Sequence, residues 1–115
     1  MSGFALKDCQ SVKVTADSVN GLRFLLGHKP KKIEILNLTT GAVAVWNDTL
    51  NAGEIFVLSA GGGAGGVGLK TANGITVISD ILDANGEGLP AGFDLGALAD
   101  FNDTTTETLS VTFVY

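Results

Sequence analysis

The C-terminal run TLSVTFVY (108–115) alternates apolar and hydroxylated side chains, and this period of two constrains the fold more than any other feature of the chain. Its apolar members share one face, and they are Leu109, Val111, Phe113 and Tyr115. Successive side chains of a β-strand point to opposite faces of a sheet. The run therefore predicts a half-buried strand.

Seven further short runs are rich in β-branched or aromatic residues. They are SVKVTA (11–16), LRFLL (22–26), KKIEILNL (31–38), AVAVW (42–46), EIFVLS (54–59), GITVIS (74–79) and GFDLGA (92–97). Turn-forming pairs such as Asn20-Gly21 and Asn73-Gly74 separate the runs. The segment NLTTGAVAV (37–45) predicts a hairpin, because residues 39–41 supply a short glycine-containing loop between two apolar runs. Only FDLGALADF (93–101) is compatible with a helical turn.

The length of 115 residues suits one domain, and an apolar content of 45% against 17% charged residues predicts a folded protein. We expect an all-β fold: a single antiparallel β-sandwich or barrel of about seven or eight short strands, formed by residues 11–115. Residues 1–10, MSGFALKDCQ, are expected to form a flexible N-terminal arm.

The charge of the chain is unevenly distributed. Residues 1–32 hold six of the seven basic side chains, whereas the formal net charge of the whole chain is −5. Nucleic acid is not an expected partner, because affinity for a phosphate backbone comes from cations. The lysines of the segment KPKK (29–32) could meet an acidic protein surface or simply solvate the start of a strand.

Targeting and cysteine content set further limits. Cys9 is the only cysteine, so an intrachain disulfide and a zinc site built on several thiolates are both excluded. The N-terminal segment lacks the apolar run of a signal peptide, and no stretch approaches the roughly 20 apolar residues of a membrane-spanning helix. We therefore expect the protein to be made and folded in the cytosol, with no membrane partner.

The glycine-rich stretch SAGGGAGGVGLKTANG (59–74) matches the G-x-G-x-x-G spacing of dinucleotide sites at Gly63, Gly65 and Gly68. Such a site needs a helix that starts at the third glycine and directs its N–H groups at the pyrophosphate. Only four residues separate Gly68 from the Asn73-Gly74 turn signal, so no helix fits. Two interpretations of residues 61–68 stay open: a mobile exposed loop, or a close contact between subunits.

Metal binding and catalysis find weak support. DANGEGLPAGFD (83–94) places acidic and amide residues at several positions of a calcium loop, but Pro90 and Asp94 depart from the pattern and turn chemistry explains the segment. The single histidine, His28, lies in a turn remote in sequence from Cys9. We expect no metal, no cofactor and no enzymatic activity.

Three blocks carry a family resemblance: GHKPKKIEILNLTTGAVAVWNDTL (27–50), TANGITVISD (71–80) and GFDLGALADFNDTTTETLSVTFVY (92–115). In this order they resemble the small virion proteins of tailed bacteriophages that are encoded near the major capsid protein. The resemblance implies a head decoration or cement protein, often a homotrimer, that binds the outer surface of the major capsid protein lattice and stabilises the head. The chain departs from the family pattern in its glycine-rich insert, residues 61–68.

Interface residues follow from this expectation. Phe4 and Leu6 lie in the arm, which would become ordered on a capsid protein or on a sister subunit. Trp46 is the third candidate, either as an interface anchor or as a core residue. The alternative function is a phage fibre or adhesin module that binds a host-surface carbohydrate, although such sites usually expose several aromatic rings.

Overall fold

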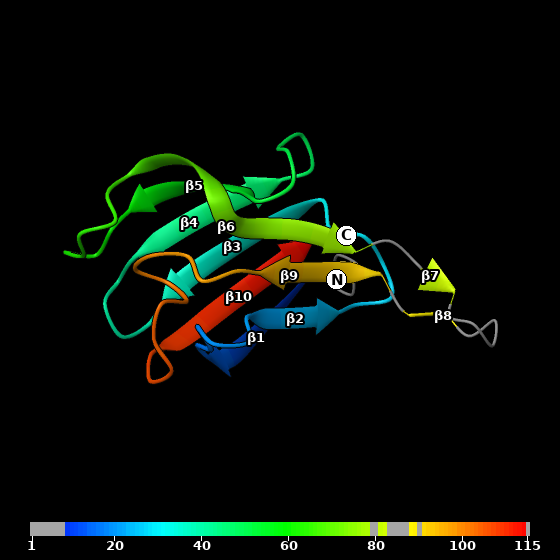
Figure 1. Ribbon diagram of the computed structural model, residues 1–115, viewed down its shortest axis with the longest axis horizontal. Coiled ribbons are helices and arrows are strands. Elements are labelled where there is room, and N and C mark those ends of the chain that lie inside the picture. The colour runs from blue at the N-terminus through cyan, green and yellow to red at the C-terminus, as the bar shows by residue number, and fades with distance from the viewer. Residues whose placement is uncertain (1–8, 79–80, 83–87, 90, 115) are drawn as a thin grey trace, which may run out of the picture.

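Each apolar run of the sequence forms a β-strand in the computed structural model, which describes residues 9–78, 81–82, 88–89 and 91–114 (Figure 1). The strands are β1 (Cys9–Thr15), β2 (Leu22–Leu25), β3 (Lys32–Asn37), β4 (Val43–Asn47), β5 (Glu54–Ser59), β6 (Gly68–Ile78), β7 (Ile81–Leu82), β8 (Gly88–Leu89), β9 (Gly92–Leu95) and β10 (Thr108–Val114). These described ranges contain no helix. Cys9 and Gln10, which the sequence assigned to the arm, pair with Val114 and Phe113, and residues 1–8 lie outside the described residues.

Eight of the strands form one antiparallel sheet in the order β1-β10-β3-β4-β5-β6-β9-β2, and β7 pairs with β8 separately. The large sheet curls into a half-barrel, which confirms the predicted all-β class. Figure 1 shows β6, β9 and β2 crossing in front of the strands at the other end of the order. We call β2, β9 and the end of β6 the front wall, and β1, β10, β3, β4, β5 and the start of β6 the back wall.

Apolar side chains fill the space between the two walls. Phe93 on β9 meets Phe113 on β10 edge to face, with ring centroids 6.1 Å apart, and Phe24 on β2 stacks on Phe93 at 4.6 Å. The alternation expected for β10 holds, since Leu109, Val111 and Phe113 are buried. Burial of these rings supplies the main driving force for folding.

The two walls join at a corner within β6. Glu54 pairs with Ile75 while the next residue, Ile55, pairs with Lys70, so residues 71–74 of β6 have no partner on β5. Asn73 adopts a φ of 62°, and a Cβ on Gly74 would lie 2.7 Å from the carbonyl oxygen of Gly53. The Asn73-Gly74 pair therefore forms a bulge inside a strand, and the predicted turn before a new strand is wrong.

One end of the half-barrel is closed by the β9–β10 connection. Phe101 is fully buried there, and the amide nitrogens of Phe101 and Asn102 donate to the carbonyl of Leu98 at 3.1 and 2.8 Å, a single helical turn. Asn102 is also fully buried: its Oδ1 accepts from the Asp17 amide at 2.6 Å, and its Nδ2 donates to the Gly96 carbonyl at 3.0 Å. The side chain thus ties the β1–β2 connection to β9.

The predicted β3–β4 hairpin is confirmed. Gly41 has a φ of 85° and donates its amide to the Asn37 carbonyl at 2.7 Å. The buried Asn37 side chain accepts the amides of Thr39 and Thr40 and donates to the Glu107 carboxylate at 2.6 Å. Asn37 therefore specifies the turn and links it to the segment before β10.

Candidate interaction surface

The outer face of the back wall carries an apolar surface at the junction of β5 and β6. Alternation on β5 buries Ile55 and Val57, so that Phe56 and Leu58 point outward with 42% and 55% of their surface exposed. Leu69 is the cross-strand partner of Phe56 and is 49% exposed. We name Phe56, Leu58, Val67 and Leu69 the outer apolar patch.

A row of outward side chains crosses the back wall and changes from polar to apolar. In register, it consists of Ser11, Thr112, Glu34, Val45, Phe56 and Leu69. At the β1 edge, the hydroxyls of Ser11 and Thr112 share a hydrogen bond of 2.7 Å. Contiguous exposed apolar surface is uncommon on monomeric proteins and marks a site of association. The outer face of the back wall is therefore apolar over β4, β5 and β6 and polar at the β1 edge.

A hollow of about 530 Å³ adjoins the patch on the same wall. Phe56, Val45 and Val114 are among its lining residues, together with Lys32 and Glu34. Trp46 contributes to the same lining, and its indole Nε1 is buried without a hydrogen-bond partner in the described part of the chain. A buried N–H without an acceptor costs about 1–3 kcal/mol. The hollow thus combines apolar walls with a cation and an anion at its rim.

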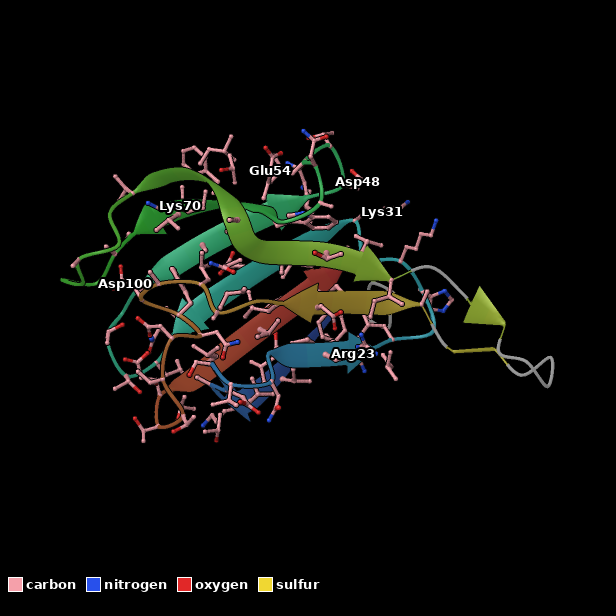
Figure 2. All side chains as sticks on the ribbon, viewed as in Figure 1. Arg23, Lys31, Asp48, Glu54, Lys70 and Asp100 are labelled. Atoms are coloured by element: carbon pink, nitrogen blue, oxygen red, sulfur yellow. The ribbon has the colours of Figure 1, made fainter. Side chains whose placement is uncertain are left out.

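The lysine segment lies beside this hollow. Lys29, Lys31 and Lys32 are exposed around the start of β3, where the Lys31 amide donates to the Val114 carbonyl at 2.6 Å. Figure 2 shows Lys31, Asp48 and Glu54 at the same end of the molecule. Both signs of charge therefore occur near the hollow, so this end of the wall is not a purely basic surface.

The glycine-rich loop packs against the β9–β10 connection. The Gly65 amide donates to Asp100 Oδ2 at 2.7 Å, and Lys70 Nζ donates to the Gly65 carbonyl at 2.5 Å. A Cβ on Gly63 would lie 1.9 Å from Asp100 Oδ1, so the close approach requires glycine there. Lys70 and Asp100 lie at the same end of the molecule in Figure 2. Gly68 begins β6, so no helix follows the glycine spacing of a nucleotide site.

The other residues that the sequence singled out are dispersed. Cys9 is exposed on β1, and His28 is exposed in the β2–β3 connection. Asp94, the last position of the calcium-loop match, forms an ion pair with Arg23, while residues 83–87 and 90 lie outside the described ranges. Among the residues that the structure describes, no group of three or more His, Cys, Asp or Glu side chains is arranged to hold a metal ion.

The predicted interface residues have different outcomes. Trp46 is 4% exposed, belongs to the core cluster and lines the hollow, so its burial agrees with a core role while its interface role stays a prediction. Phe4 and Leu6 lie outside the described residues, so their interface role stays a prediction. Sequence reasoning missed Phe56 and Leu58, although EIFVLS is apolar at four consecutive positions and so has an apolar side chain on both faces of its strand.

In comparisons with known proteins, no family model, no curated protein and no solved structure matches the chain. Where the chain is described, it has no helix with the length and hydrophobicity needed to span a bilayer.

Proposed function

We propose that this protein is a binding protein without enzymatic activity that docks through the outer apolar patch and the adjoining hollow onto a repeating protein surface. The observation that carries the proposal is the grouping of Phe56, Leu58, Val67 and Leu69, each 42–64% exposed, around one strand junction of an ordered β body. A patch of this kind loses its contact with water when a partner covers it, and that burial favours association.

The sequence resemblance supplies the identity of the proposed partner. Among the small virion proteins of tailed bacteriophages, the implied role is head decoration, so we propose the major capsid protein as the surface that the patch contacts. The proposed location is the exterior of the virion, with the protein bound as a homotrimer. Neither the partner nor the number of subunits follows from the fold.

The chemistry of the patch suits a lattice. Its side chains are apolar, and the neighbouring Lys32 and Glu34 give the contact an orientation, because a partner must present charges of the opposite order. Each contact is small, but repeated contacts across a shell raise the effective concentration of every neighbour. Modest affinity per site is therefore sufficient for stable decoration.

Reconstitution tests the proposal. Purified protein is mixed with expanded phage shells that lack it, and the bound fraction and the heat resistance of the shells are measured. We expect saturable binding in a fixed ratio to the major capsid protein. Sedimentation equilibrium on the free protein measures the subunit number. The absence of binding to the shells would contradict the capsid function.

Matched substitutions test the surface itself. Leu69 in the patch and Leu25 outside it are 49% and 48% exposed, so Leu69→Ser and Leu25→Ser make the same change at equal exposure. We expect about fivefold weaker shell binding for Leu69→Ser, since covering the exposed half of a leucine contributes about 1 kcal/mol. Leu25→Ser should bind as the unmodified protein does. Equal weakening by both would exclude the patch as the docking surface.

A further inference from the structure

Four glycines from separate segments meet on the outer face of the front wall and leave a hollow of about 440 Å³ there. Gly21 precedes β2, Gly53 lies before β5, Gly74 forms the corner of β6, and Gly96 follows β9. The Gly96 amide donates to the Gly74 carbonyl at 3.1 Å, which brings the two backbones together. A Cβ on Gly74 would lie 2.7 Å from the Gly53 carbonyl oxygen, and a Cβ on Gly96 would lie 2.9 Å from Asn73 Cα, so glycine lets these backbones lie close together beside the hollow.

The rim of this hollow is polar. Arg23, Asp94 and Thr76 lie in one cross-strand row over β2, β9 and β6, on the outward side of the wall. Arg23 Nε and Nη2 donate to Asp94 Oδ1 and Oδ2 at 2.9 and 3.0 Å, a bidentate pair at the edge of the molecule that Figure 2 labels at Arg23. The carboxylate of Asp94 raises the pKa of Arg23 above its usual value by hydrogen bonding and charge.

Asn20 and Asn73 complete the rim on either side of the row. Asn73 lies at the corner of β6, is exposed and has a φ of 62°. Within the described ranges, no hydrogen bond involves the Asn73 amide group or the Thr76 hydroxyl. Both groups are therefore available as donors and acceptors for a ligand.

The charges at the rim select the class of ligand. Arg23 and Asp94 neutralise each other. An anionic ligand would be repelled by the Asp94 carboxylate and a cationic ligand by the Arg23 guanidinium, so the pair favours a neutral ligand. Arginine has five N–H donors and uses two on Asp94, and each carboxylate oxygen keeps a free lone pair. The rim thus presents planar donors and acceptors side by side, a pattern that matches adjacent hydroxyl groups on a neutral ring.

We propose that this hollow binds a neutral pyranose sugar, with Asp94, Arg23, Thr76 and Asn73 as hydrogen-bonding partners of the ring hydroxyls. Its volume of about 440 Å³ falls within the range of small-molecule sites, about 300–1,000 Å³. No aromatic side chain of the described residues lines the hollow, so binding relies on hydrogen bonds and is expected in the millimolar range. The site lies on the front wall, and the proposal is independent of the docking function assigned to the back wall.

Nuclear magnetic resonance titration tests the site directly. The ¹⁵N-labelled protein is titrated separately with D-glucose, D-galactose, D-mannose and L-rhamnose, and with sodium acetate as an anionic probe. We expect at least one sugar to give saturable shifts at the amides of Gly21, Gly74 and Gly96, with the amides of β10 unmoved. Failure of all four sugars to shift these amides would overturn the proposal, as would stronger binding of acetate at the same place.

Two substitutions, Thr76→Val and Asn73→Gly, each remove one proposed hydrogen bond to the sugar while preserving the backbone. Thr76→Val keeps the shape and removes the hydroxyl, and Thr112→Val makes the same change on the outer face of the back wall as the matched control. We expect Thr76→Val to weaken sugar binding about fivefold, the effect of one neutral hydrogen bond, and Thr112→Val to leave it unchanged. Asn73→Gly retains the positive φ without the amide and should weaken binding to a similar extent. Sugar affinity unaffected by both Thr76→Val and Asn73→Gly would overturn the assignment of the site.

Discussion

The outer faces of the two walls obey the same alternation but present opposite chemistry. On the back wall the outward positions of β5 and the start of β6 include Phe56, Leu58 and Leu69. On the front wall the outward row beside the hollow is Arg23, Asp94 and Thr76, and the apolar Leu25 lies outward farther along β2. The buried inward positions of both walls are apolar apart from Asn37 at the end of β3. Since the core needs only the inward set, the two outer faces can differ without loss of the fold, and the two binding proposals rest on that difference.

The contrast between inward and outward side chains predicts the largest effect on stability. Phe93→Ala removes the ring that contacts both Phe24 and Phe113, so the free energy of unfolding should fall by about 3–5 kcal/mol. Phe56→Ala makes the same change on the outer apolar patch and should cost about 1 kcal/mol or less. Urea unfolding followed by circular dichroism measures both. A loss above about 2 kcal/mol for Phe56→Ala would show that the patch is covered in the free protein.

The corner of β6 separates the two walls, and disrupting it should have the second-largest effect on the free energy of unfolding. Gly74→Ala places a methyl group against the backbone of Gly53 and Glu54, and such overpacking costs about 1–3 kcal/mol. Asn73→Gly at the neighbouring position introduces no contact and should change the free energy of unfolding by less than about 0.5 kcal/mol. Urea unfolding compares the two variants. Equal stability of both would mean that the corner yields without strain.

The same corner shows why sequence reasoning succeeded only in part. Alternation and turn residues predicted the eight strands of the large sheet and the β3–β4 hairpin, because those signals are local. Asn73-Gly74 was misassigned because a turn and a bulge demand the same backbone conformations, and only the pairing of Glu54 with Ile75 distinguishes them.

The candidate site was less accessible from the sequence. The four apolar positions of EIFVLS show that both faces of β5 are hydrophobic, but the neighbours that cover or expose each face come from other strands. The glycine loop is largely exposed, as one of its two interpretations holds, but the sequence did not indicate its contact with Asp100, which is 35 positions away from Gly65. No local pattern encodes a contact over that separation.

The glycine-rich loop adjoins the outer apolar patch on the back wall and not the front wall. Loosening this loop should therefore affect stability less than the substitutions above and should affect only the back wall. Asp100→Asn preserves the shape and tolerates the φ of 69°, but it replaces the charged acceptor of the Gly65 amide. We expect a loss of about 0.5–1.5 kcal/mol in the free energy of unfolding and faster amide exchange in residues 61–66. Hydrogen exchange with mass spectrometry measures the latter.

Because Val67 lies between this loop and β6, Asp100→Asn should also weaken docking through the outer apolar patch. Sugar binding in the hollow on the front wall should be unchanged. The control is Asp103→Asn, at the next acidic position of the same connection, whose carboxylate accepts the Asp100 amide at 3.0 Å. Equal exchange rates at Gly65 in both variants would show that Asp100 does not hold the loop.

The smallest effect is a pH dependence confined to the front wall. Hydrogen bonds from the backbone of Asn20, its side chain and the backbone of Val19 lower the pKa of Asp17, and Asn20 lies at the rim of the polar hollow. A carboxylate with a lowered folded-state pKa stabilises the fold above its unfolded value of about 3.9, and this contribution is lost as the pH falls through the lower folded value. Asp17→Asn keeps an acceptor oxygen but cannot titrate.

The difference in stability between the unmodified protein and Asp17→Asn should therefore be constant above about pH 5 and shrink as the pH falls below 4. Urea unfolding at successive pH values measures it, with amide shifts of residues 17–21 as the local readout. Phe56 and Leu69 in the outer apolar patch have no carboxylate hydrogen bond among their described contacts. Their amide chemical shifts should therefore be the same in the unmodified protein and in Asp17→Asn, and should not change with pH over this interval. A difference that grows on acidification would mean that Asp17 is stabilised as the neutral acid and that its hydrogen bonds do not favour the charged form.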